Sequence, residues 1–142
     1  MTIIEKIKQS IECATQLHFY YDDRDALNTI LDDAEFPCVV SHLVEQGAIS
    51  DELGVFHERL TMEVWFEDLA CPDANGIQNE QTIDRMKRLA LAWLTSLRIN
   101  QDIKLISINS TGRHYLDRDV MTTGYAVTIT FDEVDGFSKC DI

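Results

Sequence analysis

The sequence is poor in the features that define several common classes of protein. Only two of its 142 residues are proline, and no apolar segment approaches the roughly 20 residues that a membrane-spanning helix requires. The opening residues carry charge where a secretion signal has an apolar run. We therefore expect a folded, cytoplasmic protein that does not span a membrane and has little general disorder.

Basic residues are also scarce. Twelve lysines and arginines stand against 25 aspartates and glutamates, which gives a formal charge of -13 at pH 7. Such a chain repels phosphate backbones and anionic lipids unless its few bases gather in one patch. Specific binding of nucleic acid is therefore not expected.

The four cysteines are far apart and form no CxxC pair or zinc-knuckle spacing. In a cytoplasmic chain they are expected to be reduced thiols. Cys13 and Cys38 stand within apolar patterns, so both are predicted to be small core residues. Cys140 falls in a tail, residues 136–142, that is expected to fray. No disulfide, metal or cofactor is expected to support the fold.

Motifs of the common enzyme chemistries are missing as well. There is no glycine-rich phosphate loop, nucleophile elbow or dinucleotide-binding fingerprint. His57-Glu58 lacks the second histidine of a zinc-binding helix. Cys38 and His42 are four residues apart on one expected strand, about 13 Å from each other. The acidic residues within 22–35 lack the ligand spacing of a calcium loop, which favours a solvated surface over a cation site. We expect no catalytic residue.

What is present is a strongly patterned helix with strand segments on both sides. Residues 79–99 repeat apolar side chains at helical spacing and carry charges elsewhere, which gives an apolar face broad enough to pack on a sheet. Residues 2–16 form a second amphipathic helix with Thr2 as its cap. Residues 25–31 are compatible with one or two helical turns.

Alternating or uniformly apolar segments predict the strands, which are residues 17–21, 36–44, 56–66, 103–108 and 124–134. The intervening segments 46–54, 69–78 and 113–123 are predicted to be connections. The whole chain, 1–142, is then one α+β domain. We expect a two-layer sandwich in which two main helices cover one face of a mainly antiparallel sheet of four to five strands.

Strand alternation and the helical period together predict the core. The strand residues expected to face inward are Phe56, Leu60, Met62, Val64, Phe66, Val127, Ile129 and Phe131. Their expected partners on the long helix are Ile83, Met86, Ala90, Trp93 and Leu97. Trp65 falls instead on the polar side of its strand. An exposed indole there indicates either a surface that another subunit covers or a chance exposed aromatic.

The elements follow one another in an order that has a known counterpart. An amphipathic helix leads to a strand entered through Phe36-Pro37, then to the strand 56–66 and the single long helix. The chain ends with residues 119–125 running into the strand residues 126–131. This order resembles the tail-terminator or tail-completion proteins of long-tailed bacteriophages and prophages. The resemblance implies a non-enzymatic subunit of a ring, commonly a hexamer, that closes the tail tube and joins it to the head.

The resemblance also implies partners: other copies of the chain, tail-tube proteins and head-completion proteins. For a ring, the interface is expected to gather scarce bases that face a neighbour's carboxylates. The residues expected there are Trp65, Arg59, Arg113 and Arg118. Two other classes stay open: a small-molecule-binding or enzymatic α+β domain, and a dimeric ferredoxin-like regulator. Assembly state distinguishes these classes from a ring subunit.

Overall fold

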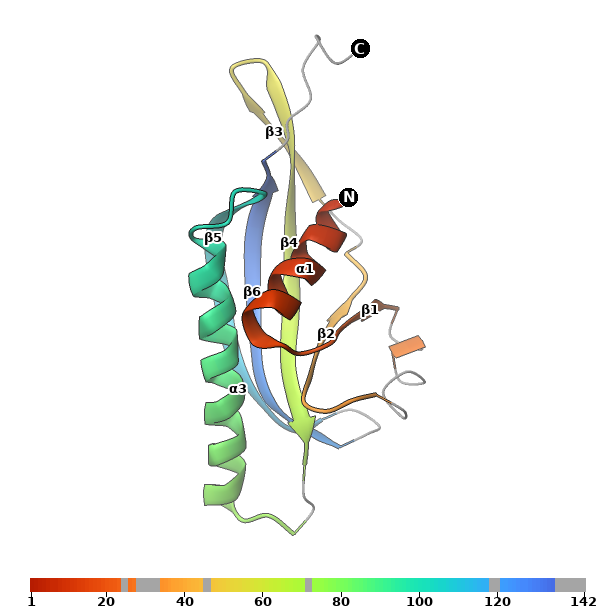
Figure 1. The fold of residues 1–142 in the computed structure, drawn as a ribbon, viewed down its shortest axis with the longest axis vertical. Helices are drawn as coiled ribbons and strands as arrows, with labels where there is room; N and C mark the ends of the chain where they lie inside the picture. The colour runs from red at the N-terminus through yellow and green to blue at the C-terminus, as the bar shows by residue number, and fades with distance from the viewer. Residues whose placement is uncertain (24–25, 28–33, 45–46, 71–72, 118–120, 135–142) are drawn as a thin grey trace.

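The computed structural model describes residues 1–23, 26–27, 34–44, 47–70, 73–117 and 121–134. Within them the fold is α+β, with two long helices and six strands of one open sheet (Figure 1). The predicted count of four to five strands is therefore wrong. No helix in this part of the chain is long and apolar enough to cross a membrane. Most of the predicted helical turn 25–31, and the tail with Cys140, lie outside the described residues.

Both helices begin at a capping box, in which side chains satisfy backbone N–H groups that the first turn leaves unpaired. The first, α1, spans Ile3–Thr15 and is capped by Thr2 and Glu5. The second, α3, spans Gly76–Leu97. It begins three residues earlier than predicted because Asn75 and Gln78 form the box.

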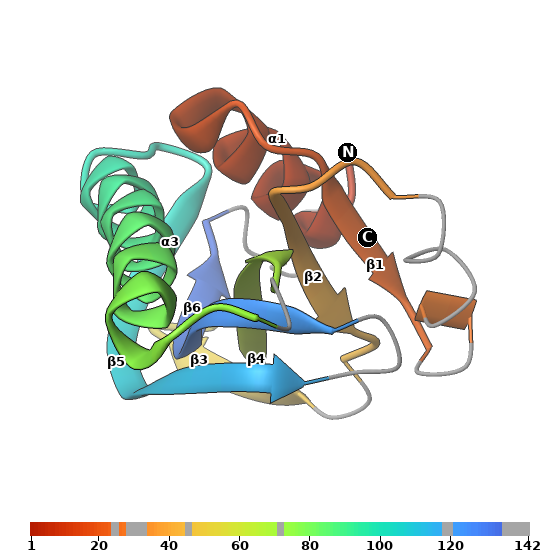
Figure 2. The same ribbon diagram turned by 90° about the horizontal axis from the view of Figure 1, so that it is seen from below.

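The strands are β1 (Phe19–Asp22), β2 (Cys38–His42), β3 (Gly47–Glu52), β4 (Val55–Leu69), β5 (Ile103–Asp117) and β6 (Thr122–Glu133). Their hydrogen-bonded order is β1-β2-β4-β6-β5, and β3 pairs with β4. The β1–β2 pair is parallel, and the other pairs are antiparallel. Figure 2 shows the sheet from below, with α1 and α3 packed beside it. Because β4 is 15 residues long, it runs for about 50 Å and carries neighbours along both sides.

Two polar segments turned out to be strands. Residues 47–52, predicted as a connection, form β3. Residues 113–117, predicted as the start of a long loop, continue β5, which passes through three irregularities in its pairing with β6. Alternation in a sequence records one buried face. Residues 47–52 have no buried face, so they carried no such signal.

One core cluster joins both helices to the sheet. Its members from α3, β4 and β6 include the predicted residues Leu60, Met62, Val64, Phe66, Met86, Ala90, Trp93, Leu97, Val127, Ile129 and Phe131, and α1 adds Ile3, Ile7 and Ile11. The predicted inward face of the strands and helix is therefore confirmed at these positions. Ile83, also predicted, is buried as well.

Two predicted core residues lie outside this core. Phe56 is 46% exposed, because its part of β4 extends beyond Arg59, the first residue of β4 that pairs with β6. Cys13 is exposed, because it lies away from the face of α1 that buries Ile7 and Ile11. Cys38, predicted in the same way, is fully buried.

Trp93 of α3 lies within the core and contacts residues of both β4 and α1. Its side chain is fully buried, and its ring centroid lies 5.9 Å from that of Phe66 on β4. Its indole N–H donates a hydrogen bond to Oγ of Ser10 on α1 at 2.9 Å. The Ser10 hydroxyl in turn donates to the carbonyl oxygen of Ile7 at 2.7 Å. One side chain therefore connects α1, α3 and β4.

Replacing Trp93 with alanine is expected to lower the free energy of unfolding by about 3–5 kcal/mol, because it leaves a large cavity and removes the donor to Ser10. Chemical denaturation followed by circular dichroism measures the change. The matched control is Leu91→Ala on the same helix, where the side chain is half exposed and little should change. Equal effects of the two substitutions would contradict this core.

Candidate functional site

The face of the sheet opposite the main core is partly covered. Buried Leu27, Cys38 and Val40 form a second cluster, and the residues packed against it are Tyr20, Ala34, Phe36 and Trp65. Trp65 is therefore half-buried, and its ring centroid lies 4.8 Å from that of His114. The prediction of an exposed Trp65 is wrong, because its side chain packs against this second cluster.

A buried carboxylate and a buried imidazole lie beside this second cluster. Oε1 of Glu67 is 3.7 Å from Nε2 of His114, with side-chain exposures of 0% and 6%. Gly124 of β6 pairs with both residues, so it stands between them in the sheet. A Cβ at Gly124 would lie 1.9 Å from the carbonyl oxygen of Phe66 and 3.0 Å from Cε1 of His114, so only glycine fits. Because Glu67 has no exposed surface, we interpret this pair as part of the second core.

Arg59, predicted at an interface, is engaged within its own chain. Its Nε and one terminal nitrogen donate to the two carboxylate oxygens of Asp132 on β6, at 2.7 and 2.9 Å. This hydrogen bonding holds the pKa of Asp132 below its ordinary value, and the positive charge of Arg59 acts in the same direction. Next to it, Nδ1–H of His57 donates to the carbonyl oxygen of Glu133 at 2.9 Å. Both contacts fasten β4 to the end of β6.

The other two predicted arginines have different outcomes. Arg113 lies on β5, exposed, and its guanidinium pairs with the carboxylate of Glu80 on α3. Both residues of this pair line a groove between α3 and β5 that is about 520 Å³ in volume. Arg118 lies outside the described residues. Any role of Arg59, Arg113 or Arg118 between subunits stays a prediction.

A two-stranded ribbon, residues 47–58, projects from the sheet beyond the end of β6 (Figure 1). It consists of β3 and the first four residues of β4. Asp51 pairs with Phe56 and Ile49 with Glu58, so Ile49 and Phe56 are diagonal neighbours on one face. That face continues the core-facing side of β4, but both apolar side chains are exposed.

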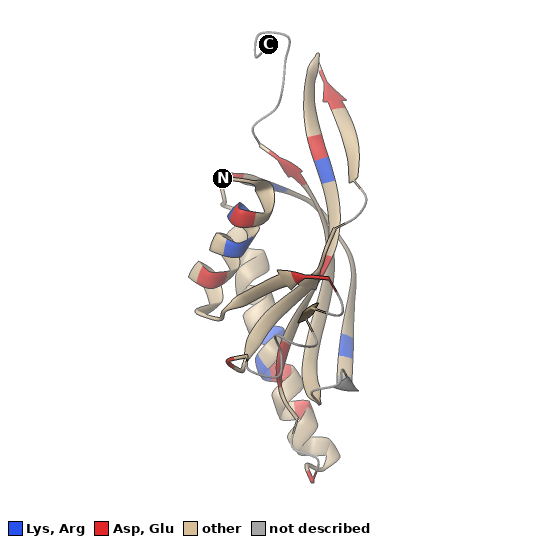
Figure 3. Ribbon diagram, turned by 90° about the vertical axis from the view of Figure 1, so that its right-hand side faces the viewer, with Lys and Arg blue, Asp and Glu red and all other residues tan. Residues whose placement is uncertain are grey.

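The ribbon is acidic and ends in an unusual turn. It has the carboxylates of Asp51, Glu52 and Glu58 and neither lysine nor arginine, and Figure 3 shows the acidic colour at the end of β3. The turn residues Leu53 and Gly54 have φ of 54° and 82°, the pattern of a type I′ hairpin turn. Leucine disfavours that backbone, and Leu53 is fully exposed. The tip therefore presents an apolar side chain without any packing benefit inside the subunit.

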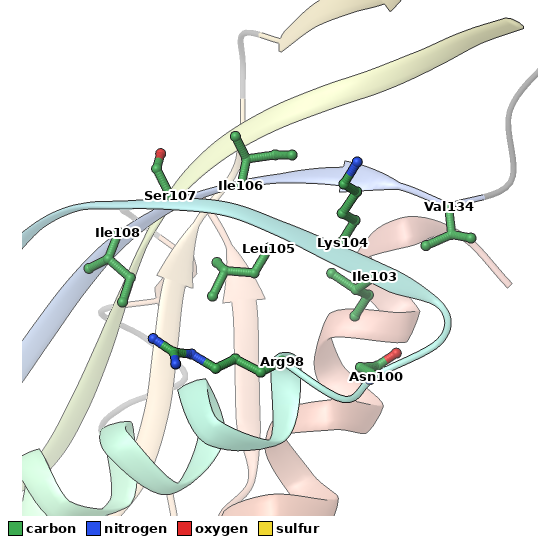
Figure 4. Close-up of a pocket in the computed structure, with 9 residues that line it drawn as sticks. All are labelled: Arg98, Asn100, Ile103, Lys104, Leu105, Ile106, Ser107, Ile108 and Val134. Carbon is green, nitrogen blue, oxygen red and sulfur yellow. The ribbon is translucent and has the colours of Figure 1, made fainter. Parts of the chain in front are cut away.

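A groove of about 550 Å³ lies at the β5 edge of the sheet, along the first half of β5 and the end of α3 (Figure 4). Its lining residues are Arg98, Asn100, Ile103, Lys104, Leu105, Ile106, Ser107, Ile108 and Val134. Figure 4 shows Lys104 and Ile106 on one side of β5, and Leu105, Ile108 and Arg98 on the other. The groove therefore follows the outer edge of the strand.

The groove combines apolar and basic groups. Ile106 and Ile108 are 37% and 43% exposed. Arg98 and Lys104 are its charged residues, and it has no carboxylate in its lining. Neither base forms an ion pair with any residue that the structure describes. The carboxylate of Asp132 stands beside this groove, since Asp132 pairs with Lys104 across the strands and the charge of Lys104 helps to lower its pKa.

Sequence reasoning missed both surfaces. The ribbon left little signal in the sequence, because Leu53-Gly54 is not among the residue pairs typical of a two-residue hairpin loop. The groove had none, because its two basic residues, Arg98 and Lys104, are exposed and leave no hydrophobic period in the sequence.

No protein-family model matches the sequence, and a search of curated proteins found no match. The function is therefore inferred from this chain's own residues and geometry.

Replacing Asp132 with asparagine is expected to lower stability at pH 7 and to make stability less sensitive to acid. The folded pKa of Asp132 is depressed, so its contribution is present above the ordinary aspartate pKa and is lost as the pH falls through the folded value. Thermal unfolding between about pH 7 and pH 3 should show the wild type and variant converging below about pH 4. Exposed Asp102→Asn is the control. A difference that is constant with pH would contradict this role.

Replacing Leu53 with asparagine is expected to stabilise the isolated subunit by about 1 kcal/mol, because asparagine tolerates positive φ far better than leucine. The control Leu53→Ala removes the same side chain but keeps the strained backbone, so its effect should be much smaller. Urea denaturation compares the two. If asparagine gave no advantage over alanine, the turn geometry would be wrong.

Proposed function

We propose that this protein is a non-enzymatic structural subunit of a phage or prophage tail. It resembles a tail terminator and assembles with copies of itself into a ring at the junction of tail and head. One observation carries the proposal: a single subunit has two open surfaces of unlike shape and charge, the acidic ribbon and the basic groove. Unlike surfaces associate head to tail, and such association gives a ring when its rotation closes.

The sheet supports this proposal through its edges. β5 has 15 residues and pairs only with β6 in the described part of the chain. Proteins cover or blunt long edges, because open backbone groups invite uncontrolled pairing. In the proposed subunit the two helices cover one face of the sheet as a two-layer sandwich, and neighbouring subunits cover what the helices leave open.

The charge of the chain also fits the proposal. Each subunit has a formal charge of -13, so a ring repels a DNA phosphate backbone. DNA then passes through the channel of the ring without sticking to it. The proposed partners are tail-tube proteins on one side of the ring and head-completion proteins on the other. The proposal assigns no catalytic residue, cofactor or metal.

Purified subunits are expected to be monomeric at low salt and to close into rings at high salt or on a tail tube. Repulsion between subunits is long-ranged at low salt. At 1 M salt the screening length is only about 3 Å, so short-range contacts determine whether subunits associate. Light scattering across a salt series measures the mass, and electron microscopy shows the shape.

The opposite result is equally clear. Subunits that stay monomeric at high salt and high concentration, and that bind no tail-tube protein, would remove the ring proposal. A dimer of fixed size across the whole series would favour the ferredoxin-like regulator instead.

A further inference from the structure

We propose that the ribbon of one subunit docks in the β5 groove of the next copy of this chain, with Ile49, Leu53 and Phe56 entering the groove. This inference rests on the proposed ring, because it names the contact that would close it. Four observations support it: charge, shape, position in the sheet, and backbone strain.

The charges of the two surfaces are complementary. The ribbon has three carboxylates and neither lysine nor arginine, whereas the groove has two bases and no carboxylate in its lining. Overall repulsion opposes association of two acidic chains, so a contact between them must gather opposite charges locally. The only pairing of these two surfaces that does so is ribbon to groove. Contact between two ribbons brings carboxylates together, and contact between two grooves brings bases together.

The shapes favour docking of side chains over pairing of strands. The register between β5 and β6 shifts between Leu105 and Ser107 and again between Ile108 and Ser110, in the part of β5 that lines the groove. Such irregularities interrupt the regular edge that a new strand would need. They leave Ile106 and Ile108 partly exposed beside an open volume of about 550 Å³. Apolar side chains from a narrow ribbon fit such a groove better than a strand does.

The position of the surfaces makes the occupant a second molecule. In the sheet, β4 and β6 lie between β3 and β5. Because two strands separate them, the ribbon and the groove of one subunit lie toward opposite edges of the same sheet. The ribbon also projects past the end of β6, away from the sheet (Figure 1). A ribbon therefore reaches the groove of a neighbour, and each subunit uses one of each.

The backbone strain at Leu53 is consistent with a role outside the subunit. An exposed leucine with φ of 54° costs free energy and contributes no packing in the isolated chain. At the tip of the ribbon it is the first apolar side chain to meet a neighbour. Docking in the groove supplies the apolar contact that the monomer lacks.

The test uses two variants, each with one surface disabled. The ribbon variant combines Leu53→Asn with Phe56→Ser, and the groove variant combines Arg98→Glu with Lys104→Glu. All four side chains are exposed in the subunit. Circular dichroism and thermal unfolding establish that both variants are folded. Matched controls are Ile77→Asn, an exposed apolar residue in the first turn of α3, and Lys8→Glu with Lys87→Glu, which makes the same change in charge.

Each variant alone is expected to stay monomeric under the salt conditions in which the wild type and both controls form rings. An equimolar mixture of the two variants is expected to give a dimer and nothing larger. In that mixture the ribbon variant retains an intact groove and the groove variant an intact ribbon. A single contact therefore forms, and no third subunit can add to the pair. Light scattering distinguishes monomer, dimer and ring by mass.

A second measurement reverses both charges in one chain. Adding Asp51→Lys and Glu58→Lys to the groove variant restores opposite charges between the surfaces, and ring formation is expected to return. Rings formed by either single-surface variant, or a mixture that stays monomeric, would overturn this contact while leaving the proposed ring intact. A wild type that never associates would overturn both the contact and the proposed function.

Discussion

The burial of Trp93 is the constraint on which the rest of the structure depends. An indole ring contributes a large apolar area to a core, but its N–H must find an acceptor when water is excluded. Ser10 supplies that acceptor from α1, and Phe66 supplies the ring contact from β4. One side chain of α3 therefore contacts both α1 and β4. What these helices leave uncovered, the edge of β5 and the ribbon, becomes the surface available to partners.

The ribbon is fastened at its base and strained at its tip. Arg59 and His57 of β4 bond to Asp132 and Glu133 at the end of β6, so the projecting segment leaves the sheet in a defined direction. Cross-strand contacts of this kind stabilise a sheet and restrict the motion of the strands they join. Arg59, which was expected at a contact between subunits, thus bonds to Asp132 within its own subunit, and this contact orients the ribbon. Toward the opposite end of the β4–β6 pairing, Gly124 allows the two strands to approach closely beside Glu67 and His114.

Predictions of the main core were mostly confirmed, whereas the predicted exposure of Trp65 was wrong, for one physical reason. Burial leaves a period in the sequence, two for a strand and 3.6 for a helix, and Met62, Val64, Met86 and Ala90 followed it. A surface residue leaves no such record of its partner. Trp65 fits a polar pattern along its strand, yet it packs against the cluster of Leu27, Cys38 and Val40.

The sequence by itself determined the α+β class, both helices, the strands with one buried face and most of the main core. These features depend on the alternation of neighbouring residues, which is local information. Only the tertiary structure decided that residues 47–52 pair with β4 as a projecting ribbon and that Arg98 and Lys104 meet in one groove. The ribbon residues and the two basic residues are mostly exposed, so no hydrophobic period in the sequence marks either surface.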